Sequence, residues 1–275
     1  EWIAYHRVLG VNGFVIADNG SRDGSRELLA SLARLGIVTV IDQPDVVNQK
    51  PQLPAYERIL RSCDRNIDLL AFIDADEFLL PLSPDVNVVD FFASQFTDES
   101  VSAIALNWAI FGSSGELFAE EGLVTERFTR HAPIKFNVHH NFKSVVKPER
   151  VNHFHNPHCA DLRFGRYIDA LGNDMVLHPK HGYGVSAEVV WNGVRVNHYA
   201  VKSLEEFLLG KHLRGKPRKT QSLFQSPRSQ RRDLPAGGRP GPESQSRNGS
   251  LAGAAGCLAR RSESAEERLL AGDPR

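Results

Sequence analysis

Residues 69–79 read LLAFIDADEFL, an apolar run that stops at two carboxylates, Asp74 and Asp76, one residue apart. A continuous apolar run is typical of a strand buried on both faces of a parallel sheet. Ligands of open α/β sheets bind outside the carboxyl ends of the strands. Two carboxylates at that edge suit a hard divalent cation, which in turn usually holds phosphate oxygens. The alternative is a polar strand end that only shapes the next turn, and the pattern alone favours neither.

Two further strands that end in aspartate precede this one. Residues 13–18 (GFVIAD) and 37–42 (IVTVID) are predicted strands, with amphipathic helix patterns after each of them. Alternating strands and helices imply parallel strands joined by crossover helices, so we predict an α/β fold with a mostly parallel central sheet. Such a sheet would bring Asp18, Asp42 and Asp74 to one edge. Aspartate is also a common turn-former after strands, which is the plainer explanation.

The rest of the chain divides into an ordered part and a tail. We predict a helix over 86–96, strands over 101–111 and 193–198, and a helix that opens with the capping box SLEE at 203–206. After residue 216, Pro, Ser, Arg, Gly and Gln dominate, and such a composition buries too little apolar surface to fold. We therefore expect a domain over 1–215 and a disordered tail over 216–275, with an isolated helix over 258–270 as an option.

Composition excludes several classes of protein. Lysine plus arginine equals aspartate plus glutamate at 33 each, so net charge predicts no nucleic-acid partner. The three cysteines have no metal-ligand spacing and form no disulfide framework, which indicates a reducing compartment. No apolar stretch approaches the roughly 20 residues of a transmembrane helix. We expect a cytoplasmic protein and leave open a peripheral attachment to a membrane.

The loop after the first strand, DNGSRDGS at 18–25, could bind a nucleotide. Its polar side chains suit a base and a ribose, and the N-terminus of the next helix favours an anion. The loop matches neither the Walker pattern nor the dinucleotide fingerprint. The plainer alternative is a capped loop, with Asp23 or Ser25 as the cap.

A histidine-rich segment, HFHNPHC at 153–159, could in principle bind zinc through its three histidines and Cys159. Its spacing matches no common zinc module. A single histidine of this segment facing an active site is the favoured interpretation.

The order of the motifs resembles glycosyltransferase family 92 and related bacterial proteins that are similar to family-2 glycosyltransferases. The matching pieces run from residue 1 to about residue 215: EWIAYHRVLGVNGFVIADNGSRDGS, FIDADEFL, AIFGSSG, FKSVVKPERV, VNHYAVKSLEEF and KHLRG. The resemblance implies a GT-A fold, a nucleotide-sugar donor and a divalent cation, often Mn²⁺.

The resemblance also implies roles for individual residues. The second aspartate of the pair contacts the metal directly, and the first reaches the ribose or a metal-bound water. A carboxylate and imidazole shell suits Mn²⁺ better than Mg²⁺. The residues implied are Asp18, Asn19, Ser21, Asp23 and Asp74 for the nucleotide sugar, and Asp76, Asp74 and His198 for the metal.

The implied reaction is transfer of a hexose from a nucleoside diphosphate sugar, a UDP-sugar favoured, to a hydroxyl of a glycan, lipid-linked or protein-linked acceptor. Inversion at the anomeric carbon requires a carboxylate base. No residue stands out as this base, and the candidates are Glu116, Asp161 and Asp169. Candidates for positive charge near the diphosphate are Lys143, Lys147, Lys202, Lys211 and Arg214.

Two departures from the family pattern keep alternatives open. A strand that usually precedes the position of Glu1 is lacking, which predicts an incomplete sheet, and the low-complexity tail replaces ordered sequence. A non-catalytic nucleotide- or sugar-binding fragment is therefore one alternative. A phosphohydrolase of the haloacid dehalogenase type is another, although Glu77 and Phe78 fit its motif poorly.

Overall fold

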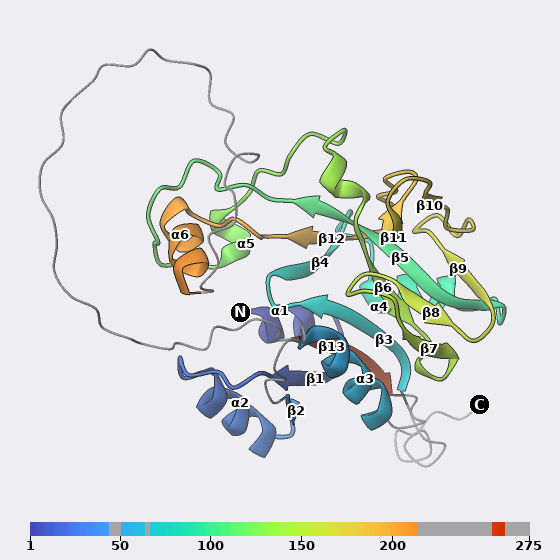
Figure 1. Ribbon diagram of the computed structural model, residues 1–275, viewed down its shortest axis with the longest axis horizontal. Helices are drawn as coiled ribbons and strands as arrows, with labels where there is room; N and C mark the ends of the chain where they lie inside the picture. Colours follow the sequence, from blue (N-terminus) through green and yellow to red (C-terminus); the bar gives the residue numbers. More distant parts are fainter. Residues whose placement is uncertain (44–50, 64–66, 214–254, 262–275) are drawn as a thin grey trace, which may run out of the picture.

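The computed structural model describes residues 1–43, 51–63, 67–213 and 255–261 (Figure 1). All elements named here lie within these ranges. The helices are α1 (Trp2–Val8), α2 (Ser25–Arg34), α3 (Gln52–Ser62), α4 (Val88–Gln95), α5 (Val124–Arg127) and α6 (Leu204–Leu213), with short 3₁₀ turns η1 (Asn137–His140) and η2 (Pro148–Arg150). The strands are β1 (Gly13–Asp18), β2 (Thr39–Asp42), β3 (Ile67–Asp74), β4 (Glu77–Pro81), β5 (Val101–Ile110), β6 (Phe142–Val146), β7 (Val151–Phe154), β8 (Ala160–Leu162), β9 (Arg166–Ile168), β10 (Leu177–His178), β11 (Gly182–Ser186), β12 (Val194–His198) and β13 (Ala255–Arg261).

One large mixed sheet forms the centre of the described structure. Its strand order is β2–β1–β13–β3–β6–β5–β12–β4, and β9 pairs with β5 beside this path. Among the described strands, five of the eight pairings are antiparallel. The α/β class is confirmed, but the expectation of a mostly parallel sheet is wrong. It extrapolated from the first three strands, whereas β4 and β6 reverse direction after a tight turn and a loop rather than after crossover helices.

The first three predicted strands do run in the same direction. β1 pairs parallel with β2, and the register places Asp18 opposite Asp42. β1 and β3 are both antiparallel to β13 and are therefore parallel to each other. Asp74 thus ends β3 at the same edge of the sheet, as predicted. β12 shares this direction, because β3 and β5 are both antiparallel to β6 and β12 is parallel to β5.

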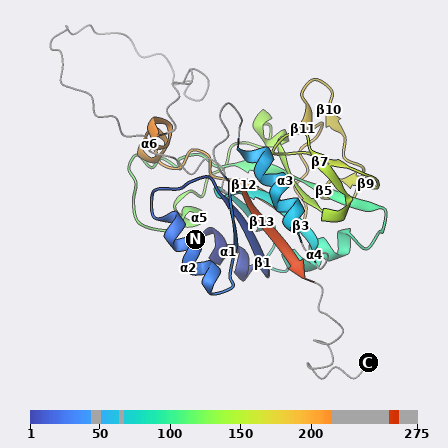
Figure 2. The same ribbon diagram turned by 60° about the horizontal axis from the view of Figure 1, so that its bottom comes forward.

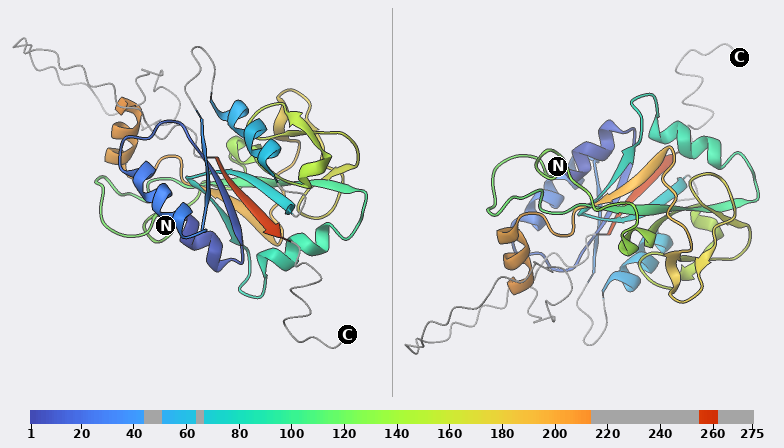
Figure 3. Two further views of the ribbon diagram at one scale, coloured as in Figure 1. Left: turned by 90° about the horizontal axis from the view of Figure 1, so that it is seen from below. Right: turned by 90° about the horizontal axis from the view of Figure 1, so that it is seen from above.

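Side chains of the central strands point alternately to the two faces of the sheet and pack into two separate hydrophobic cores. Phe14 and Ile16 of β1 pack on one face with residues of α1, α2 and α4, whereas Val15 and Ala17 pack on the other face with α3 and the β7–β8 hairpin. This alternation follows from the two-residue period of a strand. Figure 3 shows α1 and α2 on one side of the sheet and α3 on the other. Helix α3 supplies Gln52 and Tyr56, two of the residues that contact the carboxylate of Asp74.

Strand β13 lies between β1 and β3, antiparallel to both (Figure 2). The expectation of an incomplete sheet is therefore wrong, since the described strands are hydrogen-bonded without a gap from β2 to β4. Residues 255–261 form a strand although they lie in the segment that we expected to be disordered. The optional isolated helix over 258–270 is therefore wrong for residues 258–261. The remainder of that tail lies outside the described residues.

The capping box of α6 is confirmed. The Ser203 hydroxyl accepts the backbone N–H of Glu206 at 3.2 Å, and the Glu206 carboxylate accepts the N–H of Ser203 at 3.2 Å. Across the described ranges, every helix is too short or too polar to cross a bilayer.

Candidate functional site

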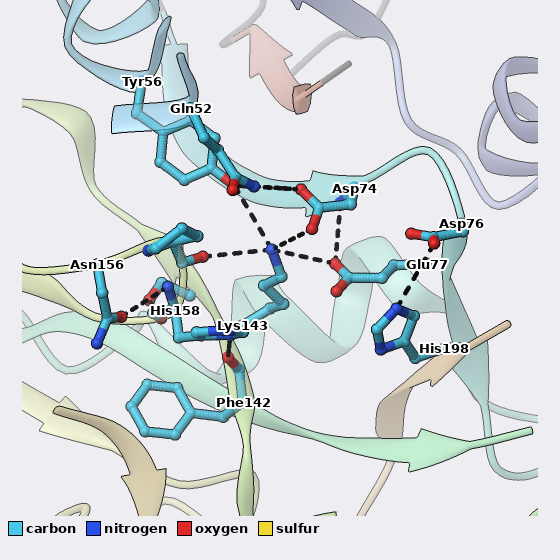
Figure 4. A network of polar contacts seen from close by, with 12 residues as sticks. Gln52, Tyr56, Asp74, Asp76, Glu77, Phe142, Lys143, Asn156, His158 and His198 are labelled. Atoms are coloured by element: carbon cyan, nitrogen blue, oxygen red, sulfur yellow. Dashed lines mark hydrogen bonds and ion pairs between the residues drawn. The ribbon is translucent and has the colours of Figure 1, made fainter. Parts of the chain in front are cut away.

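Asp74 is held by protein donors on both of its carboxylate oxygens (Figure 4). The amide of Gln52 on α3 donates to Oδ1 at 2.7 Å, and the ammonium of Lys143 on β6 lies 3.1 Å from Oδ2. Tyr56, also on α3, completes this side at 3.5 Å from Oδ1. Asp74 keeps 30% of its side chain exposed, so its carboxylate remains reachable from the strand edge.

Glu77 supports the same turn from inside the protein. Its Oε2 accepts the backbone N–H of Asp74 at 2.9 Å and lies 3.3 Å from Lys143 Nζ. The side chains of Glu77 and Lys143 are 0% and 1% exposed. In buried pairs of this kind, loss of one partner costs about 3–5 kcal/mol because the other charge is left unpaired.

The pKa values of this pair reflect two carboxylates around one ammonium. Burial opposes charge on Lys143, yet the carboxylates of Asp74 and Glu77 raise its pKa well above the usual range. Full burial raises the pKa of Glu77 to about 7; Lys143 opposes this rise and Asp74 adds to it. The ammonium is therefore charged at neutral pH, and its positive charge is shared between two acids.

Asp76 and His198 form the second contact of the site. His198 ends β12, where the register sets it opposite Glu77 of β4, and its Nε2 lies 3.7 Å from Asp76 Oδ2. Burial opposes ionisation of Asp76, but the contact with His198 and the charges of His198 and Lys202 lower its pKa to about 2. Burial lowers the pKa of His198, but Asp76 and Glu77 outweigh this effect and raise it.

The pair fits a divalent cation that is shared with a substrate. A separation of 3.7 Å exceeds the roughly 3.2 Å limit of a good hydrogen bond, so neither group is saturated by the other. His198 Nδ1 is also buried without a hydrogen-bond partner among the described residues. No group of three His, Cys, Asp or Glu side chains in the described ranges could enclose a metal. Cations that activate phosphates are often held by one or two protein carboxylates plus the phosphates themselves.

The indole ring of Trp108 packs against two histidines of the site, His198 and His158. The Trp108 ring on β5 lies 4.3 Å from the ring of His198 and 4.9 Å from that of His158, measured between centroids. The indole Nε1 is buried without a hydrogen-bond partner among the described residues. His158 Nδ1 lies 3.1 Å from the Phe142 carbonyl, and burial, reinforced by the charge of Lys143, lowers the pKa of His158 to about 4. His158 is therefore neutral and donates through Nδ1.

The predicted nucleotide loop lies at the ends of β1 and β2. The Asp18 carboxylate is buried and accepts the N–H and hydroxyl of Ser21 at 3.1 and 2.5 Å. Arg26 of α2 lies 3.5 Å from Asp18 and 2.6 Å from Asp42, so one guanidinium bridges two of the strand-end carboxylates. The loop is thus organised by Asp18 and carries a cation beside it.

The start of α2 differs from the expected cap. Gly24 occupies the N-cap position with φ of 87°, a left-handed conformation that glycine adopts at little cost. Asp23 accepts the N–H of Ser25 at 3.1 Å and therefore shapes the turn without capping the helix.

The three candidate bases lie outside the polar network of Figure 4. Asp161 on β8 contacts His153 at 3.3 Å and His155 at 3.4 Å. Asp169 accepts the N–H groups of its own turn, from Leu171 and Asn173. Glu116 is half-buried in the loop that precedes α5, and its backbone carbonyl accepts the N–H of Leu204 at 3.3 Å.

The other cationic candidates and the histidine segment have separate surroundings. Lys147 lies 3.8 Å from Glu99, whereas the Lys211 side chain and Arg214 lie outside the description. His153 and His155 face Asp161 while His158 faces Phe142, so the potential zinc ligands point to different partners.

Sequence reasoning missed several members of this site. Glu77, Gln52, Tyr56 and Trp108 were not assigned to it, and Lys143 was named only as one of five candidates for positive charge near the diphosphate. One signal was present: Lys143 is the only charged residue in the strand FKSVV, and a lone charge in an apolar strand is usually paired.

Comparison with known proteins identifies the family. The family model of Glycosyltransferase family 92 matches residues 1–184. A glycosyltransferase family 92 protein of Ricinus communis is 28% identical over 194 residues, which are 65% of this chain and 32% of that protein. Another, of Oryza sativa subsp. japonica, is 25% identical over 195 residues, 67% of this chain and 31% of that protein. The chain thus spans about a third of the length of these curated relatives. Because the family model covers well over half of its 275 residues, the chain belongs to glycosyltransferase family 92.

Proposed function

We propose that this chain binds a nucleoside diphosphate sugar, a UDP-sugar favoured, and transfers its hexose to an acceptor hydroxyl with inversion. The observation that carries the proposal is the Asp76–His198 pair at the carboxyl edge of β3 and β12, beside an Asp74 that is already neutralised. Family membership supports the same reaction class. We also propose that the fold is of the GT-A type, with the nucleotide loop and the Asp74–Asp76 turn at one sheet edge.

The residues divide into nucleotide and metal groups. Asp18, Asn19, Ser21 and Asp23 would contact the nucleotide, and Asp74 its ribose or a metal-bound water. Asp76 and His198 would hold the cation, with Mn²⁺ preferred over Mg²⁺ for a mixed carboxylate and imidazole shell. When bound, the cation neutralises charge on the leaving diphosphate.

The bonding changes require one base. The bond from the anomeric carbon to the diphosphate oxygen breaks, and a bond to the acceptor oxygen forms. The acceptor proton passes to a carboxylate, for which Glu116, Asp161 and Asp169 are the candidates. Glu116 is the first to test, because Asp161 and Asp169 already serve local partners.

The proposal is tested by nucleotide release. UDP- and GDP-sugars are incubated with the chain, Mn²⁺ and simple acceptors, and free nucleotide is measured. We expect release that depends on Mn²⁺, and a loss of at least about 100-fold in Asp76→Ala, the scale seen when one group stabilising developing charge is removed. Circular dichroism should show that the variant keeps its fold.

Other outcomes favour the alternatives. Full activity in Asp76→Ala would contradict the metal assignment. Tight UDP binding without turnover would instead indicate a non-catalytic binding module, and phosphate release from a generic ester would indicate a phosphohydrolase.

A further inference from the structure

The ammonium of Lys143 is fully used by the protein. It lies 3.1 Å from Asp74 Oδ2, 3.3 Å from Glu77 Oε2 and 3.2 Å from the carbonyl of Pro157. The Tyr56 hydroxyl lies 3.5 Å from the same nitrogen. A lysine has three N–H donors, so these acceptors leave none of them free. With its side chain 1% exposed, Lys143 is in no position to bind a diphosphate directly.

The two acids of the Asp-x-Asp turn have different partners as a result. Asp74 is engaged on Oδ1 by Gln52 and on Oδ2 by Lys143. Within the described residues the carboxylate of Asp76 pairs with His198, at a distance of 3.7 Å that leaves it unsaturated. The chain therefore neutralises one carboxylate internally and leaves the other open.

The backbone of the turn depends on the same lysine. Glu77 Oε2 accepts the N–H of Asp74 and also lies against Lys143, so the ammonium braces the junction of β3 and β4 through Glu77. The turn carries three carboxylates, from Asp74, Asp76 and Glu77, within four consecutive residues. Without the ammonium of Lys143, the carboxylate of Asp74 would compete with that of Asp76 for a metal ion.

We propose that Lys143 is a positioning residue that occupies Asp74, so that a divalent cation is presented with Asp76 and His198 alone. This inference rests on the proposed function. It assigns to Lys143 a role different from that of a phosphate ligand, and it predicts that removing the lysine strengthens metal binding while weakening turnover.

The first test compares the two aspartates without disturbing Lys143. Binding of Mn²⁺ in the presence of UDP is measured by electron paramagnetic resonance of the free ion in wild type, Asp74→Asn and Asp76→Asn. The carbonyl oxygen of asparagine at position 74 can still accept from Lys143, and its NH2 group can donate to the Gln52 amide once that amide is turned over. We expect the Mn²⁺ affinity of Asp74→Asn to stay within about twofold of wild type, and Asp76→Asn to lose at least about tenfold. Equal losses in both variants would overturn the proposal.

The second test removes the cation. In Lys143→Met we expect Mn²⁺ affinity to rise by about tenfold or more. The reason is that a positive charge within about 4–6 Å of a carboxylate weakens the binding of another cation to it by about one to three powers of ten, and the variant removes that charge. Nucleotide release should fall in the same variant. A merely structural lysine would instead lower affinity and turnover in parallel with loss of fold, and that result would overturn the proposal.

The double variant Glu77→Gln/Lys143→Met guards against misfolding, because it removes both buried charges together. Its Mn²⁺ affinity should also exceed that of wild type, and an affinity at or below wild type would count against the inference. If wild type binds no Mn²⁺ even with UDP, the proposed function itself fails. If it binds but Asp74→Asn and Asp76→Asn are equivalent, only the role of Lys143 fails.

Discussion

The imidazole of His198 meets two different environments. Its Nε2 faces Asp76 across 3.7 Å, while Nδ1 is buried with no hydrogen-bond partner among the described residues. The ring is fixed instead by packing on Trp108 and by the pairing of His198 with Glu77 across β12 and β4. The position of the ring therefore depends on strand register rather than on a second hydrogen bond.

Replacing His198 tests its part in the metal shell. We expect His198→Ala to weaken Mn²⁺ affinity at least about tenfold, the lower end of the cost of disturbing groups around a metal. The measurement is a Mn²⁺ titration of nucleotide release, with His181→Ala at an exposed position as the matched control. An unchanged titration would remove His198 from the shell.

For single residues, the sequence indicated which side chains could bind a metal, but it did not indicate which charged side chains are buried. Asp74 and Asp76 stand out because they follow an apolar run, and the resemblance pointed to His198. Lys143 could not be separated from surface lysines, because its partner Glu77 lies 66 positions earlier and only the fold brings them together. Pairings over such distances leave no local pattern.

Helix α1 is joined to strand β4 by three side chains. Trp2 donates to the carbonyl of Glu77 at 2.7 Å, and Tyr5 donates to that of Leu79 at 2.9 Å. His6 Nε2 accepts the N–H of Leu79 at 3.2 Å, while its Nδ1 donates to the Trp2 carbonyl at 2.8 Å. These bonds fix one neutral tautomer of His6, because each ring nitrogen already has a defined role. The helix thereby supports the strand that follows the Asp-x-Asp turn.

This joint should make stability depend on pH. Burial lowers the pKa of His6 to about 4 in the folded protein, against about 6.5 in the unfolded chain. Above pH 6.5 both states are neutral and the contribution of His6 is complete. Between pH 6.5 and 4 only the unfolded state takes up the proton, so stability falls with falling pH by up to about 1.4 kcal/mol per pH unit.

His6→Gln tests this dependence, since glutamine can accept from Leu79 but does not titrate. Urea unfolding at a series of pH values should give a shallower slope between pH 6.5 and 4 than wild type, whatever the absolute stability of the variant. His153→Gln, at an exposed position, controls for the loss of an imidazole. A slope as steep as that of wild type would contradict the role of His6.

The elements themselves were predictable to different degrees. β1 has the expected bounds, and β3 extends the expected strand by two residues, because apolar runs ending in aspartate mark both clearly. The expected helix over 86–96 is α4, whose N-cap Asn87 accepts the N–H groups of Val89 and Asp90. The reversals at β4 and β6 were not predicted, since alternation within a strand does not reveal its neighbours or their direction.

Over the whole molecule, the unexpected element is β13. Composition marked its surroundings as unable to fold, and nothing local in residues 255–261 indicates where they pair. Their register against β1 and β3 supplies hydrogen bonds to the strands that end in Asp18 and Asp74. A short segment can be ordered in this way by the partners that it completes, even when its own sequence is a weak strand former.

Deleting residues 255–261 tests this pairing. β1 and β3 each lose a hydrogen-bonded neighbour, so their amides should exchange with deuterium at least about tenfold faster in the deletion variant. The amides between β5 and β12, which do not contact β13, serve as the internal reference. Unchanged protection of β1 and β3 would contradict the pairing.

The position of β13 near the end of the described residues also delays completion of the sheet during synthesis. β3 is complete at residue 74, but its partner begins only at residue 255, which is 255 − 74 = 181 positions later. At about 5–20 residues per second, a ribosome needs on the order of ten seconds to half a minute to bridge that interval. Throughout it, the facing edges of β1 and β3 lack the strand that finally joins them, and unpaired edges recruit other strands. The sheet can therefore pair with the wrong strand until β13 has been synthesised.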